Sequence, residues 1–260
     1  MGTKTCPLYL VIVTPGFGVL ATAERQEAAP MPDTSTDTEV LLKVSEHLDV
    51  FRSEFIECLE PVQPTTRSIL LRIFEVWRQA NLRRLVDLGD SAHLLFSQGR
   101  LVPGCTLTRA LFETVGVQYY IHKKMVDYTD ECDPESIHIL LGAAIFGRKD
   151  ASNWPTTPIQ VLTAIDHMDK EFTGSRSEYD HLCEYAHPNL KGGFGTYVYQ
   201  SLPSLGSKFG LNPQALEMRT WGLGSLNIIL IIASKVYGRL DSLHPKFVSM
   251  AMEHAPNHPR

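Results

Sequence analysis

An all-α fold, a bundle of about six or seven helices, is the class that this sequence predicts. Apolar residues recur at three- and four-residue steps through nearly the whole chain after residue 37. A capping side chain precedes proline at three expected helix starts. No repeat with a period of about 20–50 residues is present, which excludes a solenoid.

The first three expected helices are defined by apolar stripes. They cover residues 38–59, 65–98 and 105–126. Pro61 closes the first of them, because proline removes a helical hydrogen bond and disfavours the helical conformation of the residue before it. Gly99 stops the second, and Gly89 predicts a bend within it.

Three later helices share the same start signal, which occurs at Asp133-Pro134, Thr157-Pro158 and Asn212-Pro213. Proline suits the first helical position because the N–H that it lacks would have no partner inside the helix. These helices are expected over residues 134–147, 158–172 and 213–240. Between the last two, a helix over 176–187 has Ser175 as its cap and Pro188 as its terminator, and residues 194–200 form an extended part of an irregular connection rather than a sheet.

Composition divides the chain into three parts. Residues 1–37 are an apolar segment and a linker, residues 38–245 the helical domain, and residues 246–260 a C-terminal tail. Three alternatives stay open for the first part. Residues 1–23 are a signal peptide, or an ordinary segment, or the product of a start codon set ahead of the true start. A signal peptide would make the protein secreted; otherwise a cytoplasmic location is expected.

Charge and cysteine content narrow the function classes. With 24 basic and 29 acidic residues the net charge is −5, so general capture of nucleic acid by charge is unfavourable and any contact has to be local. The five cysteines are scattered, and no cysteine/histidine set has the spacing of zinc ligands, so we expect neither metal nor cofactor. The apolar run over residues 220–234 is short for a membrane span, which favours a buried core helix and no span.

A charged pair lies in one of the most apolar expected helices. Arg109 and Glu113 stand four residues apart, so they share a helix face. The residues between them are mostly apolar, which places the pair near the core. Because a charge near the core is costly without a partner, we expect one from another helix, either His187 or Tyr179.

The stretch SRSEYDHLCEYAHPN, residues 175–189, gathers further polar groups. On a regular helix Arg176, Asp180, Glu184 and His187 share a stripe, whereas His181 lies about 140° away from Arg176. A solvated helix face is one interpretation. The other is a site, because the helix ends on a histidine and a glycine-rich loop follows, which allows close backbone approach.

Together these two segments resemble a family. An Arg-x-x-x-Glu helix followed by Tyr-x-x-Leu-x-Glu-Tyr-x-His-Pro-Asn over residues 179–189 resembles an uncharacterised bacterial branch of the HEPN superfamily. The resemblance covers about residues 65–240. It implies an all-α homodimer that is a metal-independent endoribonuclease or an RNA-binding relative, acting in toxin–antitoxin or phage-defence systems with an antitoxin or another operon partner.

The resemblance leaves two assignments of catalytic residues open. The superfamily's Arg-x(4–6)-His signature is met by Arg176 and His181, and the other assignment uses Arg109 with His187. Histidine titrates near neutral pH and can take the proton of a ribose 2′-OH, while arginine binds phosphate with two hydrogen bonds. The residues expected to bind or support are Glu113, Tyr179, Glu184 and Asn189.

A second function class stays open beside the ribonuclease. In it the chain is a non-catalytic helical binding module, and its Arg/Glu/His cluster is a buried structural network. The basic residues of the helix over 65–98 also allow two interpretations, a surface that binds successive phosphates of a nucleic acid or an ordinary solvated helix face. They are Arg67, Arg72, Arg78, Arg83 and Arg84.

Overall fold

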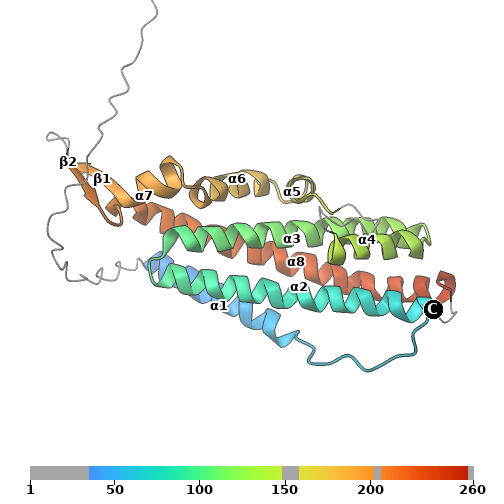
Figure 1. Cartoon of the computed structure of the whole chain (residues 1–260). Coiled ribbons are helices and arrows are strands. Elements are labelled where there is room, and N and C mark those ends of the chain that lie inside the picture. The colour runs from blue at the N-terminus through green and yellow to red at the C-terminus, as the bar shows by residue number, and fades with distance from the viewer. Residues whose placement is uncertain (1–34, 148–157, 202–205, 257–260) are drawn as a thin grey trace, which may run out of the picture. The chain divides into compact units, whose positions relative to one another are not determined.

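The computed structural model describes residues 35–147, 158–201 and 206–256, and it confirms the all-α class (Figure 1). Its four long helices are α1 (Ser35–Ser53), α2 (Thr66–Ser97), α3 (Leu101–Asp130) and α8 (Leu216–His254). The short helix α4 (Pro134–Phe146) packs on α3 and α2. The signal-peptide alternatives for residues 1–23 fall outside the described residues.

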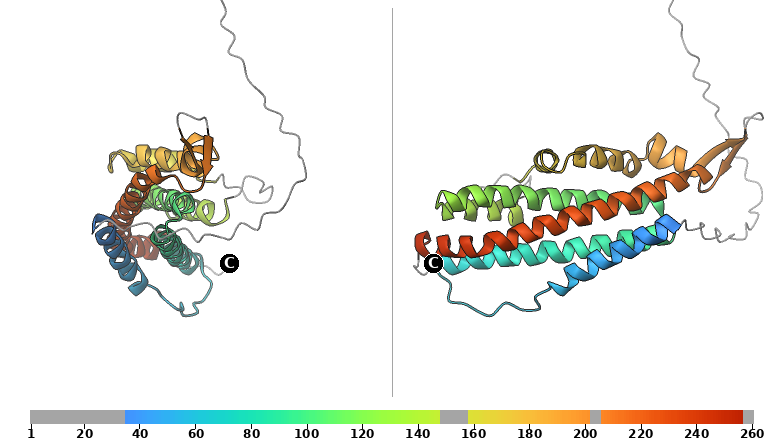
Figure 2. Two further views of the ribbon diagram at one scale, coloured as in Figure 1. Left: turned by 90° about the vertical axis from the view of Figure 1, so that its left-hand side faces the viewer. Right: turned by 180° about the vertical axis from the view of Figure 1, so that it is seen from behind.

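A second layer covers one side of α3. It consists of α5 (Val161–Asp169) and α6 (Ser175–Ala186), and both pack on α3 (Figure 2). In Figure 1, α6 runs along α3, whereas α5 is seen nearly end-on and crosses it. A π-helical turn η1 (Leu190–Phe194) and the short α7 (Gly195–Tyr197) follow α6. α3 therefore has neighbours on most of its circumference, since α2 and α8 pack on its other sides.

The core lies where α2, α3 and α8 meet. Its fully buried side chains include Phe74, Phe96, Leu111, Phe112, Val115, Leu226 and Phe247. Glycines bring the helices close together: a methyl group built on Gly89 would lie 2.6 Å from a Leu48 methyl group of α1. Gly89 thus allows α1 and α2 to pack closely. A bend was predicted at this glycine, but α2 continues past it as one helix.

The helix ends follow the predicted capping chemistry in part. Asp133 accepts a hydrogen bond from the Ser136 N–H at 3.0 Å, with Pro134 at the first helical position, as predicted. Gly99 follows the cap of α2 with φ 70°, the left-handed conformation in which many helices end. By contrast, Pro213 opens only a 3-10 turn, η2 (Pro213–Ala215), before α8 begins. The Thr157 start lies outside the described residues, and α5 begins at Val161 rather than at residue 158.

Several predicted boundaries are corrected. α1 covers Ser35–Ser53 instead of residues 38–59, so it ends well before Pro61. The predicted tail from residue 246 is helical to His254, because Phe247, Met250 and Ala251 are buried in the core and extend α8. Residues 194–200 include the strand β1 (Val198–Ser201), which pairs antiparallel with β2 (Gly206–Phe209); backbone hydrogen bonds there make a two-stranded hairpin where an irregular connection was predicted.

The helix α8 is also the one helix among the described residues that is long and apolar enough to cross a membrane. Its apolar side chains have a second explanation, because Leu223, Leu226, Leu230 and Val236 are fully buried in the bundle. A core helix of this kind passes the same test of length and composition. Our expectation that the chain has no membrane span stays a prediction.

Candidate functional site

The predicted pair in α3 is completed by a residue of α6. Arg109 lies 3.0 Å from Glu113, and the Tyr179 hydroxyl donates a hydrogen bond to the same Glu113 carboxylate at 3.0 Å. The Arg109 guanidinium in turn donates to the Tyr179 oxygen at 3.4 Å and lies over the ring, 5.5 Å from its centre. Of the two partners predicted for the pair, the structure places Tyr179 there.

The Tyr179 hydroxyl stays protonated throughout the neutral range. Burial, the first of several causes, raises its pKa to about 12. A neutral phenol both donates and accepts, so it satisfies the carboxylate and the guanidinium together. The cluster of Arg109, Glu113 and Tyr179, called the α3–α6 joint below, therefore fastens α6 to α3 by charge-assisted hydrogen bonds.

A second set of contacts fastens α6 to α8. The His181 ring lies on the Trp221 ring, with 4.1 Å between their centres, and Tyr185 contacts the same indole at 5.5 Å. Ser225 donates a hydrogen bond to Glu178 at 2.8 Å. Burial lowers the pKa of His181, so the ring is neutral at physiological pH and packs as an aromatic side chain.

Arg176 faces a different neighbour from His181. Its guanidinium binds Asp166 of α5 at 2.6 Å and Asp180 of α6 at 3.0 Å, which neutralises the charge locally. The first turn of α6 is regular and is capped by Asp169, which accepts from the Gly174 and Arg176 N–H groups. Because the helix is regular, the large angular offset between Arg176 and His181 holds, and the structure does not bring these two into one cleft.

His187 lies outside the α3–α6 joint, which corrects its predicted place in the core. The helix ends at Ala186, and His187 takes an extended conformation with ψ 146°. The chain therefore leaves the helical path after His187, and the His187 side chain is exposed. Among the described residues its ring makes no hydrogen bond or ring contact, so it is the one predicted site residue with an uncommitted side chain.

Two other predicted site residues, Asn189 and Glu184, build the turn that follows His187. The Asn189 side chain accepts from the N–H groups of Lys191 and Gly192, both at 3.0 Å, and donates to Glu184 at 2.9 Å. Gly192 is required here, since a methyl group on it would lie 2.1 Å from the His187 carbonyl oxygen. Asn189 and Glu184 thus shape the turn.

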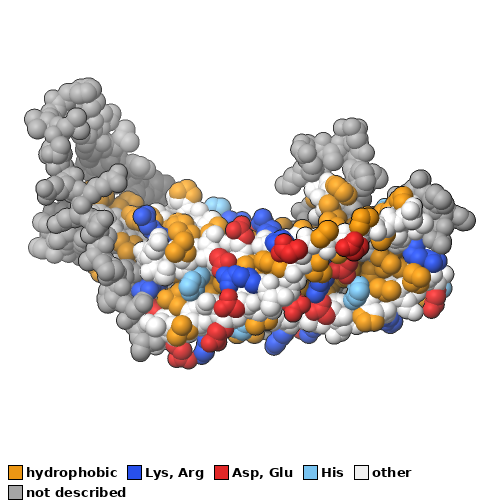
Figure 3. Space-filling view, turned by 90° about the horizontal axis from the view of Figure 1, so that it is seen from below, with side chains coloured by type: hydrophobic (Ala, Val, Ile, Leu, Met, Phe, Trp, Pro, Cys, Tyr) orange, Lys and Arg blue, Asp and Glu red, His pale blue; other side chains and the backbone are white. Residues whose placement is uncertain are grey.

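The arginines of α2 are also committed to partners inside the chain. Arg78 pairs with Asp241 and Arg83 with Glu57, whereas Arg84 donates to Thr114. Arg67 and Arg72 donate to backbone carbonyl groups. On the face shown in Figure 3, basic and acidic side chains are interspersed without a continuous basic surface. These contacts favour the interpretation of an ordinary helix surface.

A further polar cluster, which the sequence analysis missed, is centred on Glu171 in the turn that joins α5 to α6. Glu171 pairs with Arg239 of α8 and accepts a hydrogen bond from Tyr119 of α3 at 2.9 Å. The hydrogen bond from Arg239 is the main reason why the pKa of Glu171 falls from its ordinary 4.5 to about 2. Its residues come from three elements far apart in sequence, so no local spacing predicts it.

We expect this cluster to contribute to acid stability. A carboxylate with a lowered pKa stabilises the fold above its unfolded pKa, near 4.5, and this contribution is lost as the pH falls toward about 2. In Glu171→Gln, the free energy of unfolding should therefore change less with pH over that range than in the wild type. Urea titrations at several pH values measure it, with Glu217→Gln, an exposed control, keeping the wild-type slope.

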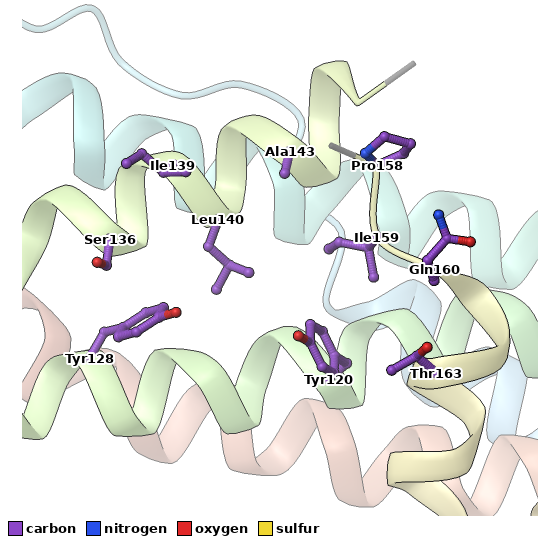
Figure 4. Close-up of a pocket in the computed structure, with 10 residues that line it drawn as sticks. All are labelled: Tyr120, Tyr128, Ser136, Ile139, Leu140, Ala143, Pro158, Ile159, Gln160 and Thr163. Atoms are coloured by element: carbon purple, nitrogen blue, oxygen red, sulfur yellow. The ribbon is translucent and has the colours of Figure 1, made fainter. Parts of the chain in front are cut away.

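One pocket lies apart from all these residues. It is a pocket of about 420 Å³ between α3, α4 and the segment that leads into α5 (Figure 4). Tyr120 and Tyr128 of α3 form one wall, and Ile139 and Leu140 of α4 another. The apolar run of α4 was a signal for it, because this helix has more apolar side chains than one buried face needs.

Among the described residues, no group of three or more histidine, cysteine, aspartate or glutamate side chains could hold a metal ion. Comparison with protein-family models, with curated proteins and with solved structures gives no match to this chain.

Proposed function

We propose that this chain is a non-catalytic helical binding module. One observation carries the proposal: Tyr179 closes the Arg109–Glu113 pair across two helices, so the carboxylate, the hydroxyl and one terminal nitrogen of the guanidinium have partners within the cluster. Arg176 is neutralised by two carboxylates, and His181 is stacked on Trp221 with a lowered pKa. Cleavage of RNA needs a titrating base beside a free cation, and none of these contacts supports that arrangement.

The proposal predicts that the α3–α6 joint acts on stability. Tyr179→Phe removes the hydroxyl that both charged groups use, and we expect a loss of about 1–2 kcal/mol in the free energy of unfolding. Tyr197→Phe is the matched control, because Tyr197 is 45% exposed, and its effect should stay within about 0.5 kcal/mol. Urea denaturation measures both variants.

The same proteins test for catalysis. Wild type is incubated with mixed structured RNAs in EDTA, and we expect no cleavage. If Tyr179→Phe were as stable as Tyr197→Phe, the joint would not be structural. If the wild type cut RNA and a point variant with an unchanged melting curve did not, the chain would be an enzyme.

One observation favours a second candidate function. The His187 ring is exposed and uncommitted beside the turn at Asn189, so it is free to contact a substrate. This supports a HEPN-like, RNA-acting homodimer with an antitoxin or another operon partner. Loss of RNA cleavage in His187→Ala, with the stability of the wild type retained, would replace the first proposal by this one.

A further inference from the structure

The helix α4 carries apolar side chains on two adjoining faces. Ile137 and Leu141 are fully buried against the bundle. A second set, with the i, i+3, i+4, i+7 spacing of one helix face, lines the pocket instead and is apolar except for its first member: Ser136, Ile139, Leu140 and Ala143. Ile139 remains 51% exposed there. The bundle thus leaves an apolar wall that no described helix covers.

The polar groups of this pocket are all uncharged. Tyr120 and Tyr128 offer hydroxyl groups from α3, and Ser136 offers one from α4. Figure 4 shows the Tyr128 hydroxyl directed along the space between α3 and α4, beside Ser136 and Leu140. Among the described lining residues there is no acidic, basic or histidine side chain. A charged ligand would lose its hydration here without gaining an opposite charge.

From these features we infer that the pocket binds an uncharged aromatic small molecule that carries a hydrogen-bonding group. The volume of about 420 Å³ falls in the range of about 300–1,000 Å³ that holds such ligands. Tyrosine rings contact aromatic molecules edge-on or with offset stacking, and their hydroxyl groups fix the orientation. The inference rests on the proposed binding function and names the class of ligand.

The test uses the full chain and Nile red, an uncharged aromatic dye with a carbonyl acceptor, whose fluorescence reports binding. We expect saturable binding of one dye per chain. Ala143→Phe fills the pocket and should abolish binding, and Tyr128→Phe should weaken it about twofold to tenfold by loss of one hydrogen bond. Ile139→Gln should also weaken it, whereas Leu94→Gln, at a site 54% exposed on α2, should leave it unchanged.

Two results would overturn the inference. One is equal dye binding by Ile139→Gln and Leu94→Gln, with melting curves showing that both are folded. The other is equal affinity for the anionic dye 8-anilinonaphthalene sulfonate, which would contradict selection for uncharged ligands. Either result would leave the RNA assay unaffected, and RNA cleavage would leave the dye measurements unaffected, so the two proposals fail separately.

Discussion

Asp37→Ala is expected to lower the free energy of unfolding by about 3–5 kcal/mol, because it removes a carboxylate beside a buried cation. The Arg219 side chain is only 2% exposed and that of Asp37 only 4%, and the two lie 3.9 Å apart. Thr220 also donates a hydrogen bond to Asp37 at 2.9 Å. The change therefore leaves a guanidinium of α8 buried without this counter-charge, at the point where α1 begins.

The control lies in the same helix. Asp49 pairs with Arg52 on the surface, and its side chain is 69% exposed. Since exposed pairs contribute about 0–1 kcal/mol, Asp49→Ala should have little effect. The double variant Asp37→Leu/Arg219→Met should be less destabilised than Asp37→Ala, because it removes the buried cation together with this carboxylate. Equal urea midpoints for Asp37→Ala and Asp49→Ala would contradict the prediction.

Apolar periodicity, together with capping residues for three of the later helices, predicted the longer helices but not their ends. The apolar stripes of α2 and α3 continue for several turns, so each helix is visible in the sequence wherever it packs on the core. The ends depend on tertiary contacts. Residues 246–254 continue α8 through Pro245 because Phe247 and Met250 are buried, and the cap of α6 is Asp169, the last residue of the preceding helix.

The candidate site could be predicted only where local geometry determines it. The pairing of Arg109 with Glu113 follows from four-residue spacing, and the angular separation of Arg176 from His181 follows from a regular helix. The exposure of His187 depends on how the chain packs where α6 ends, which spacing does not give. The burial of Arg219 against Asp37 joins the two ends of the domain, and the sequence placed Arg219 only at the border of an apolar run.

The contact between α2, α3 and α8 shows how glycine and aromatic residues define one packing arrangement. The Phe96 ring is fully buried at this contact. A methyl group built on Gly104 of α3 would lie 2.9 Å from the ring, and one built on Gly222 of α8 would lie 2.8 Å from it. The ring thus occupies a space that exists because both positions lack a side chain.

Phe96→Ala should therefore destabilise the fold by about 3–5 kcal/mol, since rigid helices on both sides cannot close the cavity. Phe209→Ala is the control, because that ring is 81% exposed, and it should change stability by less than about 0.5 kcal/mol. Gly222→Ala tests the same space from the other side and should cost about 1–3 kcal/mol through overpacking. A mild effect of both Phe96→Ala and Gly222→Ala in urea denaturation would mean that the three helices do not meet as closely as the glycines indicate.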